Sequence, residues 1–484
     1  MLFSSLAFIF YFLPITLALN YLLSFNRTAQ NIWLLIASLF FYAWGEPFFV
    51  LILMLSVLVN WFLGLIVDHV REHKGRAKLI IWIACLYNLG FLFFYKYLGF
   101  VCRNINSVLN ALIGRELLNF PVIALPLGIS FFTFQALSYV IDVYRNDAKV
   151  QKNPFFVGLY LAFFPQLVAG PIVRYADIHE ALLNRKVDFS MFSDGICQFI
   201  AGMGRKVLIA NSMGIVADHI FNLSALGHNS YNVPASLAWL GLAAYTFQIF
   251  FDFSGYSEMA LGMGKMFGFR FLVNFNYPYI SKSIAEFWRR WHISLSTWFR
   301  EYVYFPLGGS RVANNDLMVR NTFIVWLITG AWQGAEWTFV LWGLWNFLFI
   351  MLERLVKWEE RRIPNWLRHI YLMLIVMIGW LFFRTTDFYQ AAQYLLNMLG
   401  MNSNGFYSDT AWMFVREYWI FFVLAIICST PVVQKFGGLL KNNLIGFMGK
   451  VYCFFLPAAY LLLFLVCVTY LAKGHYNPFI YFNF

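Results

Sequence analysis

Charged residues are scarce in this chain. Asp, Glu, Lys and Arg make up 12% of its 484 residues, against roughly 25% in an ordinary soluble domain, whereas 61% of the residues are hydrophobic and 21% are aromatic. A soluble protein of this length needs a charged shell that so few charges cannot provide. The apolar surplus therefore faces lipid, and we expect an all-α polytopic membrane protein.

Cysteines and acidic residues are also few. The six cysteines lie far apart, mostly inside apolar runs, and no two form a C-x-x-C pair, so we expect neither disulfides nor a metal site. Lys and Arg number 35 against 23 Asp and Glu, which gives a net charge of +12. In so apolar a chain this excess is typical of cytoplasmic loops, and we expect no nucleic-acid partner.

Long apolar runs fill most of the remaining sequence. The first extends from Met1 to about Leu23 with no basic residue before it and no small-residue cleavage site after it, so we expect a retained helix. The basic positions at Arg27, 69–78 and 145–152 all lie in the cytoplasm if the N-terminus lies outside. This choice predicts a multi-pass protein of the cytoplasmic (inner) membrane.

The apolar runs predict roughly eleven to thirteen membrane segments. Several are short or interrupted by Gly and Pro, which indicates re-entrant or half-helices around a cavity near residues 250–340, because irregular backbone in lipid needs polar partners. We expect one domain over 1–484, with a core at about 121–384 and peripheral helices at about 1–120 and 385–484. The runs are 1–23, 33–44, 48–67, 79–97, 121–143, 155–170, 195–217, 235–251, 321–329, 337–352, 370–383, 416–433 and 453–472.

Ionisable side chains within the apolar runs are costly in lipid and are therefore candidate functional residues, with structural ion pairing as the alternative. Asp252 and Glu258 lie among aromatic residues in the stretch 250–270. Its G-x-G-x-x-x-G spacing follows no predicted β-strand, so close helix packing explains the glycines better than nucleotide binding does.

A second polar stretch is SKSIAEFWRRWHISLSTWFREYVYFPLGGSR at 281–311. Helical spacing allows Glu286 to pair with Arg290 and places His292 and Ser296 on one face. The Trp and Arg residues are typical of an interfacial amphipathic helix, so we expect short helices along the cytoplasmic face or dipping into it. A lone histidine is more often structural than catalytic, and spacing alone gives His292 no chemical role.

In the third stretch, at 329–346, Gln333 and Glu336 interrupt an aromatic-rich span. A glutamine amide can donate and accept hydrogen bonds, but it does not titrate and cannot act as a general base. An interhelical hydrogen bond is the simpler explanation of Gln333. The residues alone leave a transporter and a membrane enzyme both open.

Several longer stretches carry a family resemblance, and together they cover most of the chain in order: FFYAWGEP (40–47), LPLGISFFTFQALSYVIDVYR (125–145), FFPQLVAGPIVRY (163–175), FQIFFDFSGYSEMALGMGKMFGF (247–269), NFNYPYISKSIAEFWRRWHISLSTWFREYVYFPLGG (274–309) and GWLFFR (379–384). The chain resembles the membrane-bound O-acyltransferase (MBOAT) family, in the branch that contains the membrane subunits of alginate and peptidoglycan O-acetyltransferases. FWRRWHISLSTWFR is the most distinctive of the shared motifs.

This resemblance implies a fold, a reaction and partners. It implies a helical core around a central tunnel, through which an acetyl group from cytoplasmic acetyl-CoA reaches a hydroxyl on the far side of the membrane for O-acetylation of a cell-envelope polysaccharide. It also implies a periplasmic, esterase-like partner as immediate acceptor, in addition to contact with membrane lipid. The resemblance places the family's active site at His292 and at the histidine of a downstream W-H-G motif.

At that second motif the sequence departs from the family, because Trp332, Gln333 and Gly334 stand at its three positions. The other seven histidines lie outside both motifs, and a hydroxyl attacks a thioester poorly unless a base removes its proton. Three explanations compete: an engineered His-to-Gln change that inactivates the enzyme, a natural enzyme in which His292 alone is the base, and a natural non-catalytic relative. We favour the first, because the residues around position 333 keep the active pattern.

The leading hypothesis is therefore an O-acetyltransferase subunit with His292 and Gln333 at the centre. The residues expected to support the site, by holding the short helices and orienting His292 or by contacting substrate, are Asp252, Glu286, Arg289, Arg290, Ser296, Trp332 and Glu336. A non-catalytic protein that binds or transports an acyl or lipid ligand is the second hypothesis. A third keeps the fold and changes the substrate, for example to teichoic-acid D-alanylation.

Overall fold

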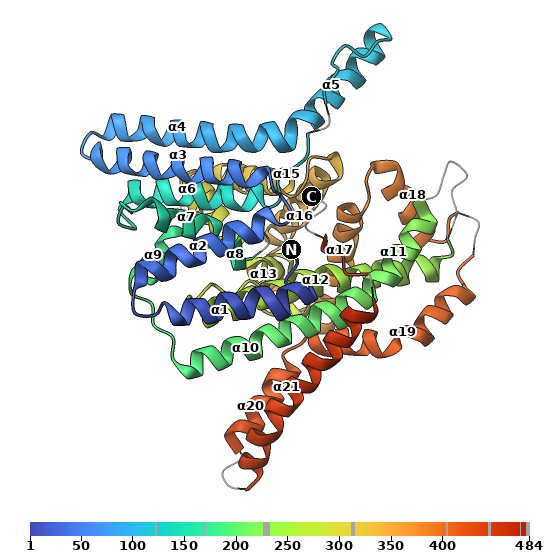
Figure 1. The fold of residues 1–484 in the computed structure, drawn as a ribbon. Helices are drawn as coiled ribbons and strands as arrows, with labels where there is room; N and C mark the ends of the chain where they lie inside the picture. The colour runs from blue at the N-terminus through green and yellow to red at the C-terminus, as the bar shows by residue number, and fades with distance from the viewer. Residues whose placement is uncertain are drawn as a thin grey trace. The chain divides into compact units, whose positions relative to one another are not determined.

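The computed structural model describes residues 1–121, 123–168, 170–225, 233–310, 315–402, 405–443, 447–474 and 476–480. Within these ranges all regular elements are helices, and no strand is present, which confirms the all-α prediction (Figure 1). The contacts divide the chain into two compact units. The first comprises Met1–Ile196 and Ala260–Leu272, and the second comprises Cys197–Met259 and Val273–Phe484.

The helices of the first unit are η1 Phe8–Phe12, α1 Leu13–Leu22, α2 Arg27–Ala43, α3 Phe49–His69, α4 Lys74–Leu92, η2 Phe93–Tyr97, α5 Leu98–Ile113, α6 Ile129–Arg145, α7 Pro154–Ala162, α8 Phe164–Leu167 and α9 Tyr175–Asn184. Two helices contribute to both units, α10 Phe189–Gly204 and α12 Ala235–Met266. Those of the second unit are η3 Arg205–Ala210, α11 Asn211–Ala225, η4 Pro278–Ile280, α13 Ile284–Arg290, α14 Ile293–Phe299, η5 Arg300–Tyr304, α15 Asn315–Gln333, α16 Trp337–Leu355, η6 Trp358–Glu360, α17 Asn365–Arg384, α18 Phe388–Met398, α19 Asp409–Cys428, α20 Val432–Asn443 and α21 Phe447–Lys473.

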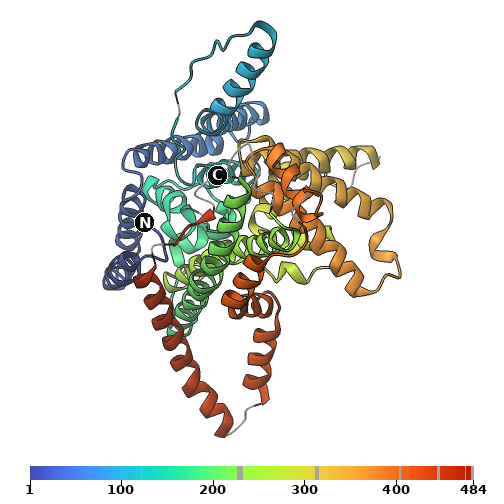
Figure 2. The ribbon, with the colours of Figure 1, turned by 90° about the vertical axis from the view of Figure 1, so that its right-hand side faces the viewer.

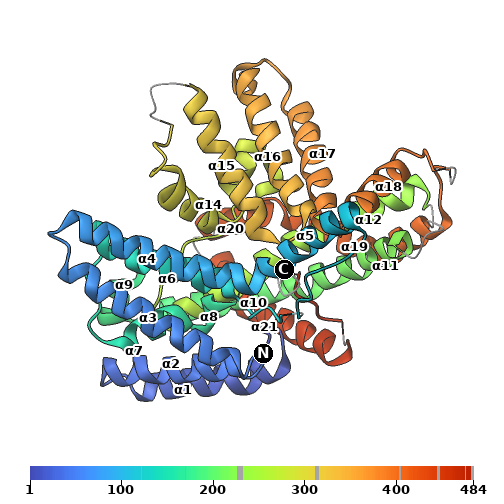
Figure 3. The ribbon, with the colours of Figure 1, turned by 90° about the horizontal axis from the view of Figure 1, so that it is seen from above.

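In the first unit α3 and α4 lie side by side, and α6 packs against both (Figures 1 and 3). Asn60 of α3 and Asn88 of α4 exchange side-chain hydrogen bonds of 3.1 and 2.7 Å. Gly64 lets α3 approach α6, since a Cβ atom at this position would lie 2.5 Å from the Tyr139 ring. Small residues and buried amides are the means by which helices associate in lipid, where apolar burial alone gives no preference.

In the second unit α15, α16 and α17 follow one another as neighbouring antiparallel helices (Figure 3). α15 and α16 cross where Gly330 faces Gly343: a Cβ on Gly330 would lie 2.6 Å from the Phe339 carbonyl oxygen, and one on Gly343 would lie 2.5 Å from the Trp326 carbonyl oxygen. The close crossing fixes the turn after α15. The last helix, α21, ends at Lys473, and the last described residues, 476–480, are not α-helical (Figure 2).

The described residues contain seven helical stretches long and apolar enough to cross a membrane. They are Phe49–His69, Lys74–Ile113, Phe189–Ser224, Trp337–Leu355, Asn365–Arg384, Asp409–Cys428 and Phe454–Lys473. This number is smaller than the eleven to thirteen expected from the apolar runs. Some of those runs form helices shorter than the roughly 20 residues that a span requires; for example, the run at 155–170 is interrupted at Phe163, between α7 and α8.

Candidate active site

The stretch after η4 forms the two short helices α13 and α14, as the sequence predicted. The N-terminus of α13 is capped twice. Ser283 Oγ accepts a hydrogen bond from the Glu286 N–H at 3.0 Å, and the Glu353 carboxylate of α16 accepts from the Ile284 and Ala285 N–H groups at 2.7 and 3.3 Å. These bonds satisfy backbone donors that a helix terminus otherwise leaves unpaired, and they attach α13 to α16.

The end of α13 is held by an ion pair and by neighbouring backbone. Arg290 lies 2.9 Å from the Glu286 carboxylate, which confirms the predicted i,i+4 pair. The Asn276 N–H donates to the Arg290 carbonyl at 2.9 Å, and the Ile293 N–H donates to the Asn274 carbonyl at 3.0 Å. The segment 274–276 thus fixes the turn between α13 and α14, and His292 lies in this turn.

His292 is only 1% exposed, and its backbone has φ 45° and ψ 54°. Such left-handed backbone is uncommon outside glycine and persists only where surrounding contacts hold it. The imidazole packs edge-on against the rings of Phe253, at a centroid distance of 4.7 Å, and Trp332, at 6.2 Å. Two aromatic walls and the α13–α14 turn therefore fix its position.

Asn274 determines which ring nitrogen of the neutral His292 imidazole carries the hydrogen atom. Asn274 Oδ1 accepts hydrogen bonds from the Ser294 N–H at 3.1 Å and from Ser294 Oγ at 2.9 Å, and it lies 3.2 Å from His292 Nδ1. A backbone N–H can only donate, so the atom that faces it is the amide oxygen, and the same oxygen requires His292 Nδ1 to donate as well. The lone pair of the neutral ring is then on Nε2.

His292 Nε2 is buried and has no hydrogen-bond partner among the described residues. His292 lies outside the seven candidate spans, and burial lowers the pKa of its imidazole to about 3. The ring is therefore neutral at physiological pH. A neutral imidazole with an unpartnered Nε2 can accept a proton from a substrate hydroxyl, which is the arrangement that a general base requires.

The turn between α15 and α16 brings the second expected motif to this site. Trp332 contacts His292, and the next residue, Gln333, is the last of α15 and is 5% exposed. Gly334 permits the tight turn, since a Cβ there would lie 2.1 Å from the Phe339 ring. Glu336 follows in extended backbone immediately before α16.

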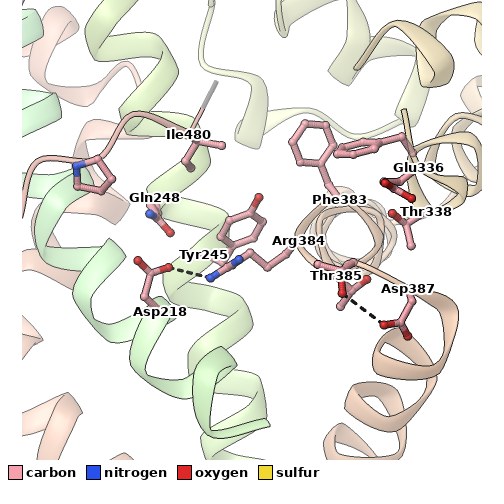
Figure 4. Close-up of a pocket in the computed structure, with 13 residues that line it drawn as sticks. Asp218, Tyr245, Gln248, Glu336, Thr338, Phe383, Arg384, Thr385, Asp387 and Ile480 are labelled. Atoms are coloured by element: carbon pink, nitrogen blue, oxygen red, sulfur yellow. Dashed lines mark hydrogen bonds and ion pairs between the residues drawn. The ribbon is translucent and has the colours of Figure 1, made fainter. Parts of the chain in front are cut away.

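Glu336 faces a cavity of about 510 Å³ within the second unit (Figure 4). The cavity is formed by residues of α11, α12, α16 and α17, by the loop after α17, and by the segment 476–480. The lining residues that the structure describes are Asp218, Tyr245, Gln248, Glu336, Thr338, Phe339, Phe383, Arg384, Thr385, Thr386, Asp387, Pro478 and Ile480. His292 and Gln333 are not among them.

Comparison with known proteins identifies the family. The MBOAT (membrane-bound O-acyltransferase) family profile matches residues 148–386. A relative from Pseudomonas syringae pv. tomato, "Probable alginate O-acetylase AlgI", is 40% identical over 394 residues, which cover 81% of this chain and 74% of the relative. A "Peptidoglycan O-acetyltransferase" from Helicobacter pylori is 33% identical over 437 residues, 83% of this chain and 80% of the relative. The chain belongs to the MBOAT family.

As an MBOAT protein, the chain is a multi-pass membrane O-acyltransferase. A more distant relative, "Teichoic acid D-alanyltransferase" from Streptococcus thermophilus, is 31% identical over 252 residues, 49% of this chain and 57% of that protein. The family resemblance seen in the sequence is therefore confirmed, and the greater identity and coverage lie with the two O-acetylation proteins.

Asp252 occupies a different place in the MBOAT fold from the one expected. Its carboxylate pairs with Lys206 Nζ at 2.7 Å and accepts a hydrogen bond from the Ile480 N–H at 2.7 Å. The side chain that holds the His292 imidazole is instead Asn274. The reason is geometric: Asp252 and Phe253 are adjacent on α12 and project in different directions, Phe253 toward His292 and Asp252 toward the C-terminal segment.

The remaining expected residues lie at other points. Arg289 forms an exposed pair with Glu359 at 3.4 Å, and Ser296 Oγ donates to the Trp288 carbonyl at 3.3 Å. Together with the Glu286–Arg290 pair, these contacts stabilise α13 and α14 without contacting the imidazole. Glu336 is separated from Gln333 by a turn and belongs to the cavity.

Three polar residues of the second unit were not found from the sequence: Asn274, Lys206 and Arg384. Each contacts a residue that is distant in the sequence. The Asn274–His292 bond joins residues 18 positions apart, and the bond from Arg384 to Asp218 joins residues 166 positions apart. Asn274 and Arg384 do lie within shared family stretches, at the start of 274–309 and at the end of 379–384. Their partners could not be read from those stretches.

Proposed function

We propose that this MBOAT protein transfers an acetyl group from cytoplasmic acetyl-CoA, through a passage in the second unit, for O-acetylation of an extracytoplasmic polysaccharide of the peptidoglycan or alginate type. Two relatives that each match about four fifths of the chain carry these names. The observation on which the proposal depends is the unpartnered, buried Nε2 of His292.

The proposed step is a general-base acyl transfer. His292 Nε2 takes the proton of the acceptor hydroxyl while the hydroxyl oxygen forms a bond to the thioester carbonyl carbon. The carbon–sulfur bond then breaks, and the proton passes from the imidazole to the leaving thiolate. Asn274 Nδ2, which is buried and has no partner among the described residues, can donate to the carbonyl oxygen as it becomes negative.

The arrangement of charges along α16 and α17 supports delivery from the cytoplasm. The loop between these helices and their adjoining turns are rich in basic residues, which the positive-inside rule places in the cytoplasm. α13 is attached to this end of α16 through Glu353, whereas Trp332 and Glu336 lie toward the other end. The basic residues are Arg354, Lys357, Arg361, Arg362 and Arg368.

Position 333 determines how much activity we expect. A glutamine at the end of α15 can hydrogen bond to a carbonyl or hydroxyl but cannot accept a proton. We propose that His292 is the only histidine base in this sequence and that Gln333 leaves the enzyme slow or inactive, consistent with an engineered or natural loss of histidine at this position. A non-catalytic role in holding an acyl ligand is the alternative that Gln333 favours.

The test uses the full chain in detergent or nanodiscs, with radiolabelled acetyl-CoA and defined acceptors. Introducing Gln333→His should increase acetyl transfer or thioester hydrolysis by about 10²-fold or more, the usual contribution of a positioned acid–base group. His292→Ala should abolish the activity of both forms. Correctly folded protein that shows no chemistry in either form, but still binds an acyl ligand after His292→Ala, would support the non-catalytic alternative.

The immediate acceptor forms a separate part of the proposal. We propose that an esterase-like periplasmic protein takes part in the acetylation, as the family resemblance implies. Reconstitution with and without such a partner, with peptidoglycan and alginate fragments supplied in parallel, distinguishes the two polysaccharides. Acetylation of one polymer alone would assign the pathway.

A further inference from the structure

Arg185, in the first unit, is a buried cation with an unused hydrogen-bond donor. It lies immediately after α9 and is 4% exposed. Arg185 Nη1 donates to Asn31 Oδ1 of α2 at 2.6 Å, and the guanidinium carbon lies 4.6 Å from the centroid of the Phe269 ring. Arg185 Nη2 is buried and has no hydrogen-bond partner among the described residues. The side chain is therefore held in place and keeps a buried donor for a further acceptor.

A second arginine lies beside Arg185. Arg27, the first residue of α2, donates from Nη1 to the Gln30 side chain at 2.5 Å and from Nη2 to the Arg185 carbonyl. Arg27 is partly exposed, so the pair extends from the interior to the surface. Burial, and then the like charge of Arg27, lower the pKa of Arg185 to about 9. Both guanidinium groups are therefore charged at neutral pH.

No carboxylate neutralises these two arginines. All 23 Asp and Glu residues lie in the ranges that the structure describes, and within those ranges none forms an ion pair with Arg27 or Arg185. Lys206, in contrast, is buried with the Asp252 carboxylate at 2.7 Å. A buried charge is costly unless it is paired, and guanidinium groups match the oxygens of a phosphate. The arginine pair therefore has the properties of a phosphate-binding site.

The arginine pair lies at the end of the first unit that we expect in the cytoplasm. The connection between α1 and α2 and the connection between α3 and α4 are at the same end, at the left in Figure 1. The second connection carries the basic stretch 69–78, which the positive-inside rule places in the cytoplasm. Basic pockets between membrane helices on this side bind the headgroups of anionic lipids.

Exposed apolar side chains flank the two arginines in the sequence. The ring of Tyr21, near the end of α1, contacts the ring of Phe192 in α10 at a centroid distance of 5.7 Å, which joins the two flanking segments. A soluble phosphate ester would leave the apolar side chains in water, whereas the acyl chains of a lipid would cover them. They therefore favour a phospholipid as the occupant. The exposed apolar residues are Leu22, Phe25, Leu183 and Phe189.

We propose that Arg185 and Arg27 bind the phosphate of an anionic phospholipid whose acyl chains lie along these apolar side chains. Arg185 Nη2 would donate to one phosphate oxygen, and Arg27 would contact another. The lipid supplies the negative charge that the protein does not, so its binding stabilises the first unit. The site is independent of acetyl transfer, which the proposed function assigns to the second unit.

The test measures lipid binding to the full chain in detergent. The protein is titrated separately with dioleoylphosphatidylglycerol and dioleoylphosphatidylcholine, which share their acyl chains and differ in net charge, and native mass spectrometry measures the lipid bound. We expect phosphatidylglycerol to bind about tenfold more tightly, because two arginines favour the anionic headgroup. Equal binding of the two lipids, or tighter binding of phosphatidylcholine, would overturn the proposal.

Variants assign the preference to the arginine pair. Arg185→Gln removes the buried charge and keeps an amide donor, so the preference should fall to about twofold, with no loss of Tm in lipid-free detergent. Arg27→Gln should also reduce the preference, and it carries the test if Arg185→Gln fails to fold. Arg76→Gln removes an exposed charge at the same end of the unit and is the matched control, which should keep the preference. A preference that survives both arginine variants, or that falls equally in the control, would contradict the assignment.

Soluble phosphates distinguish the two possible sources of the phosphate group. The Tm of the full chain is measured with phosphatidylglycerol, with inorganic phosphate and with CoA. We expect phosphatidylglycerol to raise the Tm of the wild type and to leave that of Arg185→Gln unchanged. An equal rise with inorganic phosphate or CoA that is also lost in Arg185→Gln would show that the site takes a soluble phosphate, and the lipid assignment would be wrong.

Discussion

The state of His292 depends on one neighbouring amide. Asn274 Oδ1 accepts hydrogen bonds from the N–H and the hydroxyl of Ser294 and from the His292 imidazole. The ring therefore cannot flip to exchange its two nitrogens without losing a buried hydrogen bond. A neutral amide fixes the tautomer without adding charge. Burial then leaves the ring with a depressed pKa, which keeps its lone pair available but makes the imidazolium costly to form.

The low pKa of His292 predicts that Asn274→Asp changes the pH dependence of kcat/KM. A carboxylate preserves the hydrogen-bond acceptor and adds a negative charge beside the ring, so it raises the pKa of His292 from about 3. Protonation then removes the base at higher pH, and the acid limb of kcat/KM should move upward. The profile is measured in whichever form, wild type or Gln333→His, is active.

Ser294→Ala is the control for that experiment, because it removes one hydrogen bond from Asn274 Oδ1 and introduces no charge. Its acid limb should remain close to that of the parent. An acid limb that stays in place in Asn274→Asp would mean that another group titrates and that His292 is not the base.

At the scale of helices, two structural features position the candidate site: the close crossing of α15 with α16, and the caps on the N-terminus of α13. The crossing sets the turn that carries Trp332 and Gln333, and the Glu353 carboxylate sets the start of α13. The imidazole lies where these two elements meet. Small shifts of either helix would therefore change the environment of His292.

Gly330→Ala tests the crossing. The added methyl group would lie 2.6 Å from the Phe339 carbonyl oxygen, and overpacking of this kind typically costs about 1–3 kcal/mol. We expect a lower Tm in detergent and altered tryptophan fluorescence. Gly90→Ala, on α4, where a Cβ meets no atom within 4 Å, is the matched control and should leave the Tm unchanged or raise it. A Tm unaffected by Gly330→Ala would contradict the close approach.

Lys206→Met tests the anchor of the C-terminal segment. The substitution leaves the Asp252 carboxylate buried without its cation, and breaking a buried pair in this way typically costs about 3–5 kcal/mol. The C-terminus should then become accessible to carboxypeptidase, and the Tm should fall.

Adding Asp252→Asn should recover much of that loss, because the amide oxygen can still accept the Ile480 N–H without a charge. A double variant no more stable than Lys206→Met would indicate that the lysine acts through contacts other than this pair.

For the whole molecule, composition and motifs were sufficient to predict the helical class, the membrane location, the family, the short helices around His292 and the Glu286–Arg290 pair. These features are local or depend on how apolar the sequence is. Asn274, Lys206 and Arg384 could not be assigned because their partners lie far away in the sequence. The contribution of Asp387, Pro478 and Ile480 to the cavity could not be predicted either, because these residues meet α11 and α12 only in the folded chain.

The orientation of the second unit can be tested in intact cells. The five basic residues between Arg354 and Arg368 predict that this end of α16 and α17 lies in the cytoplasm and that the cavity end lies outside. In a background with the six natural cysteines replaced by alanine, a membrane-impermeant maleimide should label Asp387→Cys in intact cells and Glu360→Cys only after permeabilisation. Both native side chains are exposed, so accessibility does not limit either reaction. The reverse pattern would place the cavity end of α16 and α17 in the cytoplasm and contradict the predicted orientation.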